Sequence, residues 1–224
     1  MYYGEIKKCD IASVKGSVIV KDFSKEKFKM HLKSNKVNVI QILPGGVVTA
    51  KDIAEIELDA NGEFVRNPEV DLVKVAVVER HQGTGNVACG FLKGYGIKEG
   101  AVALSVAHDS HNIIVVGVND DEMEFAVNSL VEQEGGIVLV KEGKVIESMP
   151  MPIAGLMSDQ SGEWVDQKLT DIHEKAYEEL GICGDVEPVM TLCFMSLAVI
   201  PEIKLTDMGL FDVTTFSFIP VEAE

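Results

Sequence analysis

Three stretches in the middle of the chain are almost continuously apolar and rich in β-branched residues. They read DLVKVAVVER over residues 71–80, GAVALSVAH over residues 100–108 and NIIVVGV over residues 112–118. A strand with one solvent-facing side alternates apolar and polar positions, whereas a strand covered on both faces does not. The pattern therefore predicts three strands in a sheet that is packed on both faces.

The spacing of the apolar positions changes after residue 118 to the three and four residues typical of a helix. Asn119 is suited to cap this helix, and Glu122 follows it by three residues, as in a capping box. The predicted buried stripe consists of Met123, Ala126, Val127, Leu130 and Val131. A second long helix is predicted over residues 162–180, with Ser161 as its cap.

The first part of the chain has short β-rich stretches separated by turn residues. Strands are predicted over residues 17–23 and on both sides of the PGG turn at residues 44–46. The dipeptide Asn61-Gly62 is a hairpin signal. A further hairpin is predicted around the turn at residues 142–143, and the tail returns to apolar runs.

These patterns predict two parts: a β-rich N-terminal segment over residues 1–65 and a larger domain over residues 66–224. Strands and helices alternate in the second part. The expected fold class is therefore α/β (α+β), a mixed β-sheet with packed helices, preceded by the small β-rich segment.

Charge and composition narrow the possible partners. The formal net charge is −16, and no cluster of Lys and Arg offsets it locally. Nucleic acid and anionic membranes are therefore not expected as partners, because phosphate groups require basic surfaces. Small molecules and other protein surfaces remain as the expected partners. The four cysteines form no CxxC pair and the first residues lack the apolar stretch of a signal peptide, so we expect a cytoplasmic protein with reduced thiols.

Reactive side chains gather where two of the apolar runs end. The first set follows residue 78 and the second follows residue 107, and together they are Glu79, Arg80, His81, His108, Asp109 and His111. If the two strands are neighbours, these groups converge, because crevices at strand ends are common ligand sites. A carboxylate, a guanidinium and imidazoles could bind a polar ligand, relay protons or hold a metal. The alternative is ordinary hydrogen-bonded loop residues.

Common catalytic motifs are missing from the sequence. The stretch GTGNVACG lacks the spacing of a dinucleotide-binding GxGxxG, and neither a Walker motif nor GxSxG is present. No HExxH or HxH occurs. His108 and His111 are spaced as HxxH, which brings both rings to one side only in a turn or a helix. We therefore expect no metal in this chain, with these two histidines as the weak candidates.

Several long stretches resemble the C-terminal domain of adenine deaminases, which belong to the amidohydrolase superfamily. They are VERHQGTGN, GFLKGYGIKEGAVALSVAHDSHNIIVVGVND, PMPIAGLMSD, MTLCFMSLAVIPEIKLTDMGLFDV and FSFIPV. The similarity runs from about residue 71 to the end and more loosely back to VNVIQILPGGVVTA. It implies hydrolysis of adenine to hypoxanthine and ammonia, with water activated on manganese or iron in a TIM-like barrel.

The barrel and its metal ligands have no counterpart among these residues, since 224 residues cannot hold an eightfold barrel and this domain. The resemblance carries over only the signature of the domain itself. It consists of Arg80, His81, Gly83, Thr84, Gly85, Asn86, His108, Asp109, Ser110, His111 and Asn112. These residues are expected to bind substrate or to face the barrel.

The resemblance and the clustered residues together support two functions. In the first, the chain supports an adenine deaminase barrel, as a domain or as a subunit. Arg80 and Asp109 then bind the purine, while His108, His111 and Glu79 are the catalytic candidates. In the second, it is a non-catalytic module for purine binding or oligomerisation. An apolar surface patch where the barrel belongs favours the first, and we expect a homo-oligomer in either case. A third possibility is a metal held by the histidines alone.

Overall fold

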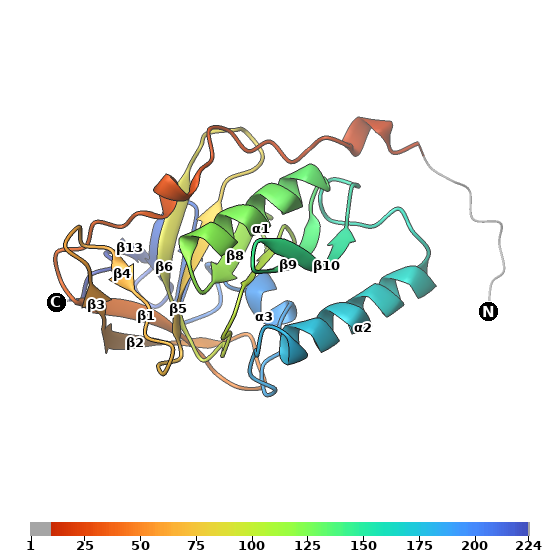
Figure 1. Ribbon diagram of the computed structural model, residues 1–224. Coiled ribbons are helices and arrows are strands. Elements are labelled where there is room, and N and C mark those ends of the chain that lie inside the picture. The colour runs from red at the N-terminus through yellow and green to blue at the C-terminus, as the bar shows by residue number, and fades with distance from the viewer. Residues whose placement is uncertain (1–9, 224) are drawn as a thin grey trace.

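Eight strands form one continuous mixed sheet in the order β10-β9-β7-β8-β5-β6-β1-β2 (Figure 1). This computed structural model describes residues 10–223. The strands are β1 Lys36–Ile42, β2 Thr49–Glu55, β5 Leu72–Val78, β6 Val87–Lys93, β7 Ala101–Leu104, β8 Ile113–Gly117, β9 Gly136–Lys141 and β10 Lys144–Pro150. β1 runs parallel to β6, and the other pairs of the sheet are antiparallel.

The central strands are buried on both faces, as the apolar runs predict. Every residue of β5, β7 and β8 is buried. Helix α1, Asp120–Glu132, covers one face of the sheet, and helices α2, Gly162–Glu178, and α3, Met190–Cys193, lie on the other (Figure 1). The fold class expected from the sequence is therefore confirmed.

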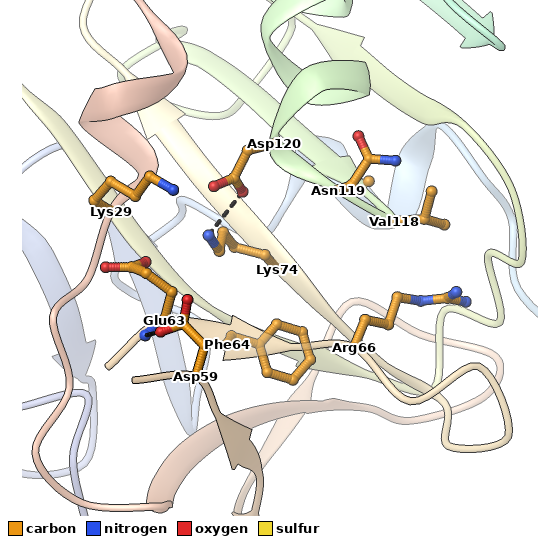
Figure 2. Close-up of a pocket in the computed structure, with 10 residues that line it drawn as sticks. Lys29, Asp59, Glu63, Phe64, Arg66, Lys74, Val118, Asn119 and Asp120 are labelled. Carbon is orange, nitrogen blue, oxygen red and sulfur yellow. Dashed lines mark hydrogen bonds and ion pairs between the residues drawn. The ribbon is translucent and has the colours of Figure 1, made fainter. Parts of the chain in front are cut away.

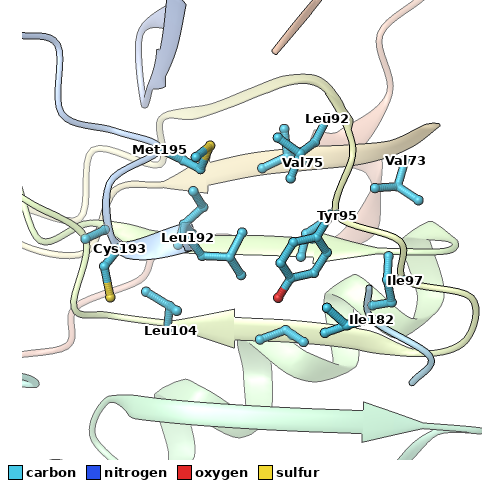
Figure 3. Close-up of a cluster of buried hydrophobic side chains, with 14 of the residues drawn as sticks. Val73, Val75, Leu92, Tyr95, Ile97, Leu104, Ile182, Leu192, Cys193 and Met195 are labelled. Atoms are coloured by element: carbon cyan, nitrogen blue, oxygen red, sulfur yellow. The ribbon is translucent and has the colours of Figure 1, made fainter. Parts of the chain in front are cut away.

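A small antiparallel sheet packs over β6 on the same face as α3. It consists of β11 Ile203–Thr206, β12 Gly209–Asp212 and β13 Ser217–Ile219. Leu205 and Leu210 lie against Gly90, whose missing side chain leaves them room. Figure 3 shows the larger core cluster on this face, where Tyr95 is buried and donates a hydrogen bond to the Pro188 carbonyl at 2.7 Å.

Smaller elements complete the N-terminal part. The Asn61-Gly62 turn joins β3, Glu57–Leu58, to β4, Phe64–Val65, in the hairpin that the sequence predicts. Two 3₁₀ turns, η1 Ala12–Val14 and η2 Lys25–Phe28, precede β1.

Residues near the C-terminus pair with the beginning of β1. The Asn38 amide N–H donates to the Val221 carbonyl at 2.7 Å, and the Asn38 side chain donates to the Pro220 carbonyl at 3.0 Å. The Glu222 carboxylate accepts from the backbone N–H groups of Lys33 and Ser34 at 2.6 and 2.8 Å. Segments 33–38 and 220–223 therefore stabilise one another.

Both predicted helix caps are confirmed. Asn119 Oδ1 accepts from the Glu122 backbone N–H at 2.8 Å, and Ser161 Oγ accepts from the Trp164 N–H at 3.3 Å. The Glu122 side chain turns instead to the Gly143 N–H at 3.1 Å, so the capping box is only half formed.

Two strand assignments need correction. Residues 17–23, predicted as a strand, have no regular structure, although Val18, Val20 and Phe23 still pack on the α1 side of the core. These three side chains are therefore partly buried without strand pairing, whereas Ile19 is 49% exposed. Strand β6 was not predicted, because its Gly90 and Cys89 interrupt the expected β-branched pattern.

The boundary expected near residue 65 falls between β4 and β5. β1 and β2 nevertheless extend the same sheet as the later strands, through the parallel pairing of β1 with β6. The division into segments 1–65 and 66–224 remains a prediction. No helix within residues 10–223 is long and apolar enough to cross a membrane.

Candidate functional site

The two sets of reactive residues meet at one end of β5 and β8. These strands are antiparallel, with Val78 opposite Ile113, so the residues after β5 lie beside those that lead into β8. The Arg80 N–H is 3.4 Å from Asn112 Oδ1, and His81 Nε2 is 2.7 Å from the Ser110 carbonyl oxygen. The predicted convergence therefore exists, although the strand beside β5 is β8 and not β7.

Glu79 holds the loop that follows β5. Its carboxylate accepts from the backbone N–H groups of His81, Gln82 and Thr84 at 2.6, 2.8 and 2.9 Å, and from Thr84 Oγ1 at 3.0 Å. Burial alone raises the pKa of Glu79, but these hydrogen bonds outweigh it and lower the pKa to about 2. Glu79 is thus an ionised carboxylate whose oxygens are already engaged, and its catalytic role remains a prediction.

Arg80 is almost completely buried, with 1% of its surface exposed. Its Nε donates to the His111 carbonyl at 2.5 Å, and one terminal nitrogen donates to the Ala154 carbonyl at 3.2 Å. The other terminal nitrogen is buried without a partner among the described residues. The guanidinium therefore joins the histidine loop to the loop at residues 153–157.

Ser105 was not predicted as part of the site, yet it fixes the second of these loops. Its hydroxyl donates to the Gly155 carbonyl at 2.5 Å and accepts from the Gly136 N–H at 2.7 Å. Gly155 has a φ of +72°, and a Cβ there would lie 2.7 Å from the Arg80 guanidinium. A serine at the end of an apolar strand was the available signal, but without a GxSxG motif it indicates no role.

His108 and His111 lie close together at the half-buried part of the site. Their ring centroids are 5.3 Å apart, and the His108 ring is 4.9 Å from that of Phe194. Burial lowers the pKa of His111, and the nearby His108 and Arg80 lower it further. His111 Nδ1 is buried without a partner in the described part of the chain. A neutral His111 can accept or donate a proton at neutral pH.

Asp207, in the turn between β11 and β12, is a second residue that sequence reasoning missed. Its carboxylate accepts from the Asn112 side chain at 3.2 Å and from the Asn86 side chain at 3.5 Å. This contact ties the small sheet to the histidine loop. No sequence signal links residues so far apart.

The remaining predicted residues surround this centre. His81, Thr84, Asn86, Asp109 and Ser110 are exposed, whereas Asn112 is buried. Gly83 and Gly85 have φ values of +62° and +75°, which glycine adopts without strain. The exposed groups are available to a ligand or to another protein surface.

The site lacks a ligand set for manganese or iron. Within residues 10–223, no group of three or more His, Cys, Asp or Glu side chains is arranged to hold a metal ion. His108 and His111 supply only two imidazoles, and manganese favours oxygen ligands. The donors of this chain therefore do not fit the metal that the resemblance implies for the barrel.

Comparison with known proteins gives one consistent result. The family model described as "Adenine deaminase C-terminal domain" matches residues 46–217. "Adenine deaminase 2" of Desulfotalea psychrophila is 66% identical over 99% of this chain and 38% of its own length. "Adenine deaminase" of Ligilactobacillus salivarius is 48% identical over 100% of this chain and 39% of its own length.

A third relative, "Adenine deaminase 2" of Carboxydothermus hydrogenoformans, is 44% identical over 95% of this chain and 37% of its own length. The chain thus spans less than two fifths of the length of these relatives. The matched region contains both loops of the site and the strands β11 and β12 of the small sheet. The chain belongs to the adenine deaminase C-terminal domain family.

Proposed function

We propose that this domain acts as the C-terminal part of an adenine deaminase, which hydrolyses adenine to hypoxanthine and ammonia. The metal, manganese or iron, belongs to an amidohydrolase barrel supplied by the rest of such an enzyme. One observation of this chain carries the proposal: Arg80, His108, Asp109 and His111 converge at a single end of the sheet. The names of the relatives support the choice of reaction.

The site residues divide into two roles in this proposal. Asp109 is exposed and hydrogen-bonds the purine or the barrel rim. His108 and His111 transfer protons to the departing ammonia, because an imidazole titrates near neutral pH. Arg80 is a positioning residue, since its guanidinium holds the His111 carbonyl and is itself buried.

Exposed apolar side chains support docking of the barrel. Phe216, in the turn between β12 and β13, and Phe218, in β13, are 74% and 53% exposed. Met208, in the turn that also carries Asp207, is 71% exposed. Scattered apolar residues are normal on a surface, but two exposed phenylalanines that both contact the Phe211 ring form an aromatic cluster typical of an interface. An independent polar module needs no such surface.

Ammonia release from adenine, measured with manganese present, tests the proposal. The chain alone is expected to be inactive, and activity should appear when it is joined to the remaining part of the Desulfotalea psychrophila relative. His108→Ala and His111→Ala should each lower kcat about 10²-fold or more, as for lost general acid–base catalysis. His173→Ala is the matched control, because His173 lies on α2 and pairs with Glu187. Unchanged kcat in both test variants would remove the histidines from the mechanism.

The alternative of a non-catalytic oligomerisation module rests on the same exposed phenylalanines. Light scattering of the variants separates the two. Phe216→Ser and Phe218→Ser should lower the molar mass of a module that self-associates through these side chains, and should leave it unchanged if the side chains contact the barrel. In our proposal the enzyme is a cytoplasmic homo-oligomer of purine metabolism, and the same two substitutions weaken attachment of the barrel.

A further inference from the structure

Residues 14–28, which we call the strap, run across the surface to the loops of the histidine site. In Figure 1 the strap is the red chain that leads from η1 to η2. Between these two turns it has no regular secondary structure. It lies before residues 46–217, which match the family model, and it contributes none of the site residues described above.

The strap forms one backbone hydrogen bond with each of two site loops, the loop after β5 and the loop at residues 153–157. The Ile19 N–H donates to the Arg80 carbonyl at 2.8 Å, and the Ala154 N–H donates to the Val14 carbonyl at 3.0 Å. The Arg80 guanidinium donates to the Ala154 carbonyl as well. Arg80 and Ala154 are therefore connected twice, by the buried guanidinium and by the strap.

The glycine-rich stretch at residues 83–86 lies against the strap. A Cβ at Gly83 would be 3.3 Å from Ile19 Cγ2, and a Cβ at Gly85 would be 2.8 Å from Lys27 Nζ. The Lys27 ammonium donates to the Gly85 carbonyl at 2.6 Å. The glycines of this stretch, whose spacing does not suit a nucleotide, therefore leave room for the strap.

The end of the strap at η2 is fixed to β5 and α1. The carbonyl of the buried Phe28 accepts from the Lys74 ammonium at 3.0 Å, and Lys74 forms an ion pair with Asp120 at 2.7 Å (Figure 2). The Lys25 N–H donates to the Glu124 carboxylate at 2.8 Å. The strap therefore extends from a well-held end towards the site loops.

The middle of the strap is held less firmly than this end. Val18, Val20 and Phe23 are only partly buried against the α1 side of the core, and Ile19 is 49% exposed. Segments with few buried contacts open locally at a lower cost in free energy than core strands. Changes in the strap should therefore alter the site loops and leave the sheet folded.

We propose that the strap is a positioning element of the histidine site. The Ile19 backbone and the Lys27 ammonium hold the loop after β5, and this loop carries Arg80. The Arg80 guanidinium in turn holds the His111 carbonyl. The effect on catalysis rests on the proposed function, whereas the positioning is a property of this chain alone. Ile19 and Lys27 therefore contribute to activity without touching the substrate.

Amide hydrogen exchange of the chain itself tests the positioning. Ile19→Pro removes the N–H that donates to the Arg80 carbonyl, and it should speed exchange of the Ala154 amide about tenfold or more. The amide of Val102, in the buried strand β7, should exchange as in wild type, which shows that the sheet is intact. Lys21→Pro is the matched control, because Lys21 is exposed and its N–H forms no hydrogen bond within residues 10–223.

Lys27→Met is a second test that leaves the backbone unchanged. It removes the ammonium that donates to the Gly85 carbonyl. In both test variants the pKa of His111, which burial lowers, should rise towards its usual 6.5 as the loops become hydrated. Lys21→Met removes an exposed lysine of the same strap and should leave this pKa unchanged. Wild-type exchange and a wild-type His111 pKa in both folded test variants would overturn the proposal, and so would equal changes in the Lys21 controls.

Kinetics of the joined enzyme separate this inference from the proposed function. Ile19→Pro and Lys27→Met should lower kcat about fivefold or more and leave KM nearly unchanged, because neither residue contacts the substrate. Both Lys21 variants should keep the wild-type kcat. If exchange and the His111 pKa change but kcat does not, the strap positions the loops and the catalytic role of the histidines fails. If kcat falls while exchange and the pKa stay as in wild type, the positioning inference fails.

Discussion

The charged groups at the two ends of the β5–β8 strand pair lie in different surroundings. At one end, Glu79 and Arg80 are buried and form hydrogen bonds with the loops around them. At the other end, Arg66 and the exposed Lys29 border a cavity, and Arg66 Nε is buried without a hydrogen-bond partner among the described residues. Within residues 10–223, unpartnered polar atoms occur at both ends, Arg80 Nη1 and His111 Nδ1 at the first and Arg66 Nε at the second, and the second end also borders a cavity of about 370 Å³.

The difference shows that reactive residues clustered in a sequence do not all face a ligand in the structure. Buried charges persist when hydrogen bonds compensate their loss of hydration, and this is the situation of Glu79. Open binding capacity is found where a charged group lacks such compensation. Substitutions at the two ends should therefore have unequal effects on stability.

The largest effect is expected from Arg80→Met. It removes the buried guanidinium that donates to the partly buried His111 and Ala154 carbonyls, which should lower the free energy of unfolding by about 3 kcal/mol. Arg66→Met, at the half-exposed opposite end, should cost less than about 1 kcal/mol. Urea denaturation measures both. If both substitutions lowered the free energy of unfolding by the same amount, the two ends would not differ in their contribution to stability.

Glu79→Gln should have the next largest effect, and this effect depends on pH. The pKa of Glu79 is lowered to about 2 in the folded chain, so its ionised form stabilises the fold above the usual value near 4.5. The stabilisation, roughly 3 kcal/mol, is lost as the pH falls from about 4.5 to about 2. The variant should thus be less stable than wild type at pH 7 and similar to it near pH 2. Glu174→Gln, on the exposed side of α2, should show no such difference.

The next effect is the difference between two glycine variants, which separates crowding from backbone strain at Gly155. Alanine there adopts a left-handed conformation and also meets the Arg80 guanidinium 2.7 Å from its Cβ. Gly143 has a similar φ of +67° but no atom within 4 Å of an added Cβ. Gly143→Ala should cost about 1 kcal/mol through strain alone, and Gly155→Ala about 1–3 kcal/mol more. Thermal unfolding of the Gly143→Ala and Gly155→Ala variants measures this difference, and equal costs would contradict the 2.7 Å approach to Arg80.

The smallest effect concerns the charge of His111. Burial and the neighbouring His108 and Arg80 lower its pKa, so NMR titration should place the pKa below the usual 6.5. The folded chain then resists a proton that the unfolded chain accepts, so this residue reduces stability as the pH falls below about 6.5. A pKa at or above 6.5 would mean that His111 is more hydrated than its surroundings indicate.

Much of the fold was predictable, because the apolar runs of β5, β7 and β8 and the caps of both long helices depend on local sequence. The segment at residues 17–23 was misjudged, since β-branched residues can pack partly buried against a core without strand pairing. Strand β6 was missed because its pairing with β5 and β1 is decided by tertiary contacts.

The residues that gather at the histidine end could be predicted from the sequence, but their roles could not. The sequence places Arg80 and His111 near strand ends, but only the register of β5 with β8 shows that the guanidinium binds the His111 carbonyl. Asp207 and Ser105 came to the site through long-range packing. The cavity residues Lys29 and Arg66 belong to separate irregular segments and form no motif.

The pairing of segments 33–38 and 220–223 has a consequence for the order of folding. The Asn38 side chain reaches its partner across 182 positions of sequence, and the Glu222 carboxylate meets Lys33 across 189. Contacts this remote in sequence form slowly, because most of the chain must be ordered before they repay the entropy of closing the loop. During synthesis, segment 33–38 therefore lacks these hydrogen-bond partners until residues 220–223 have left the ribosome.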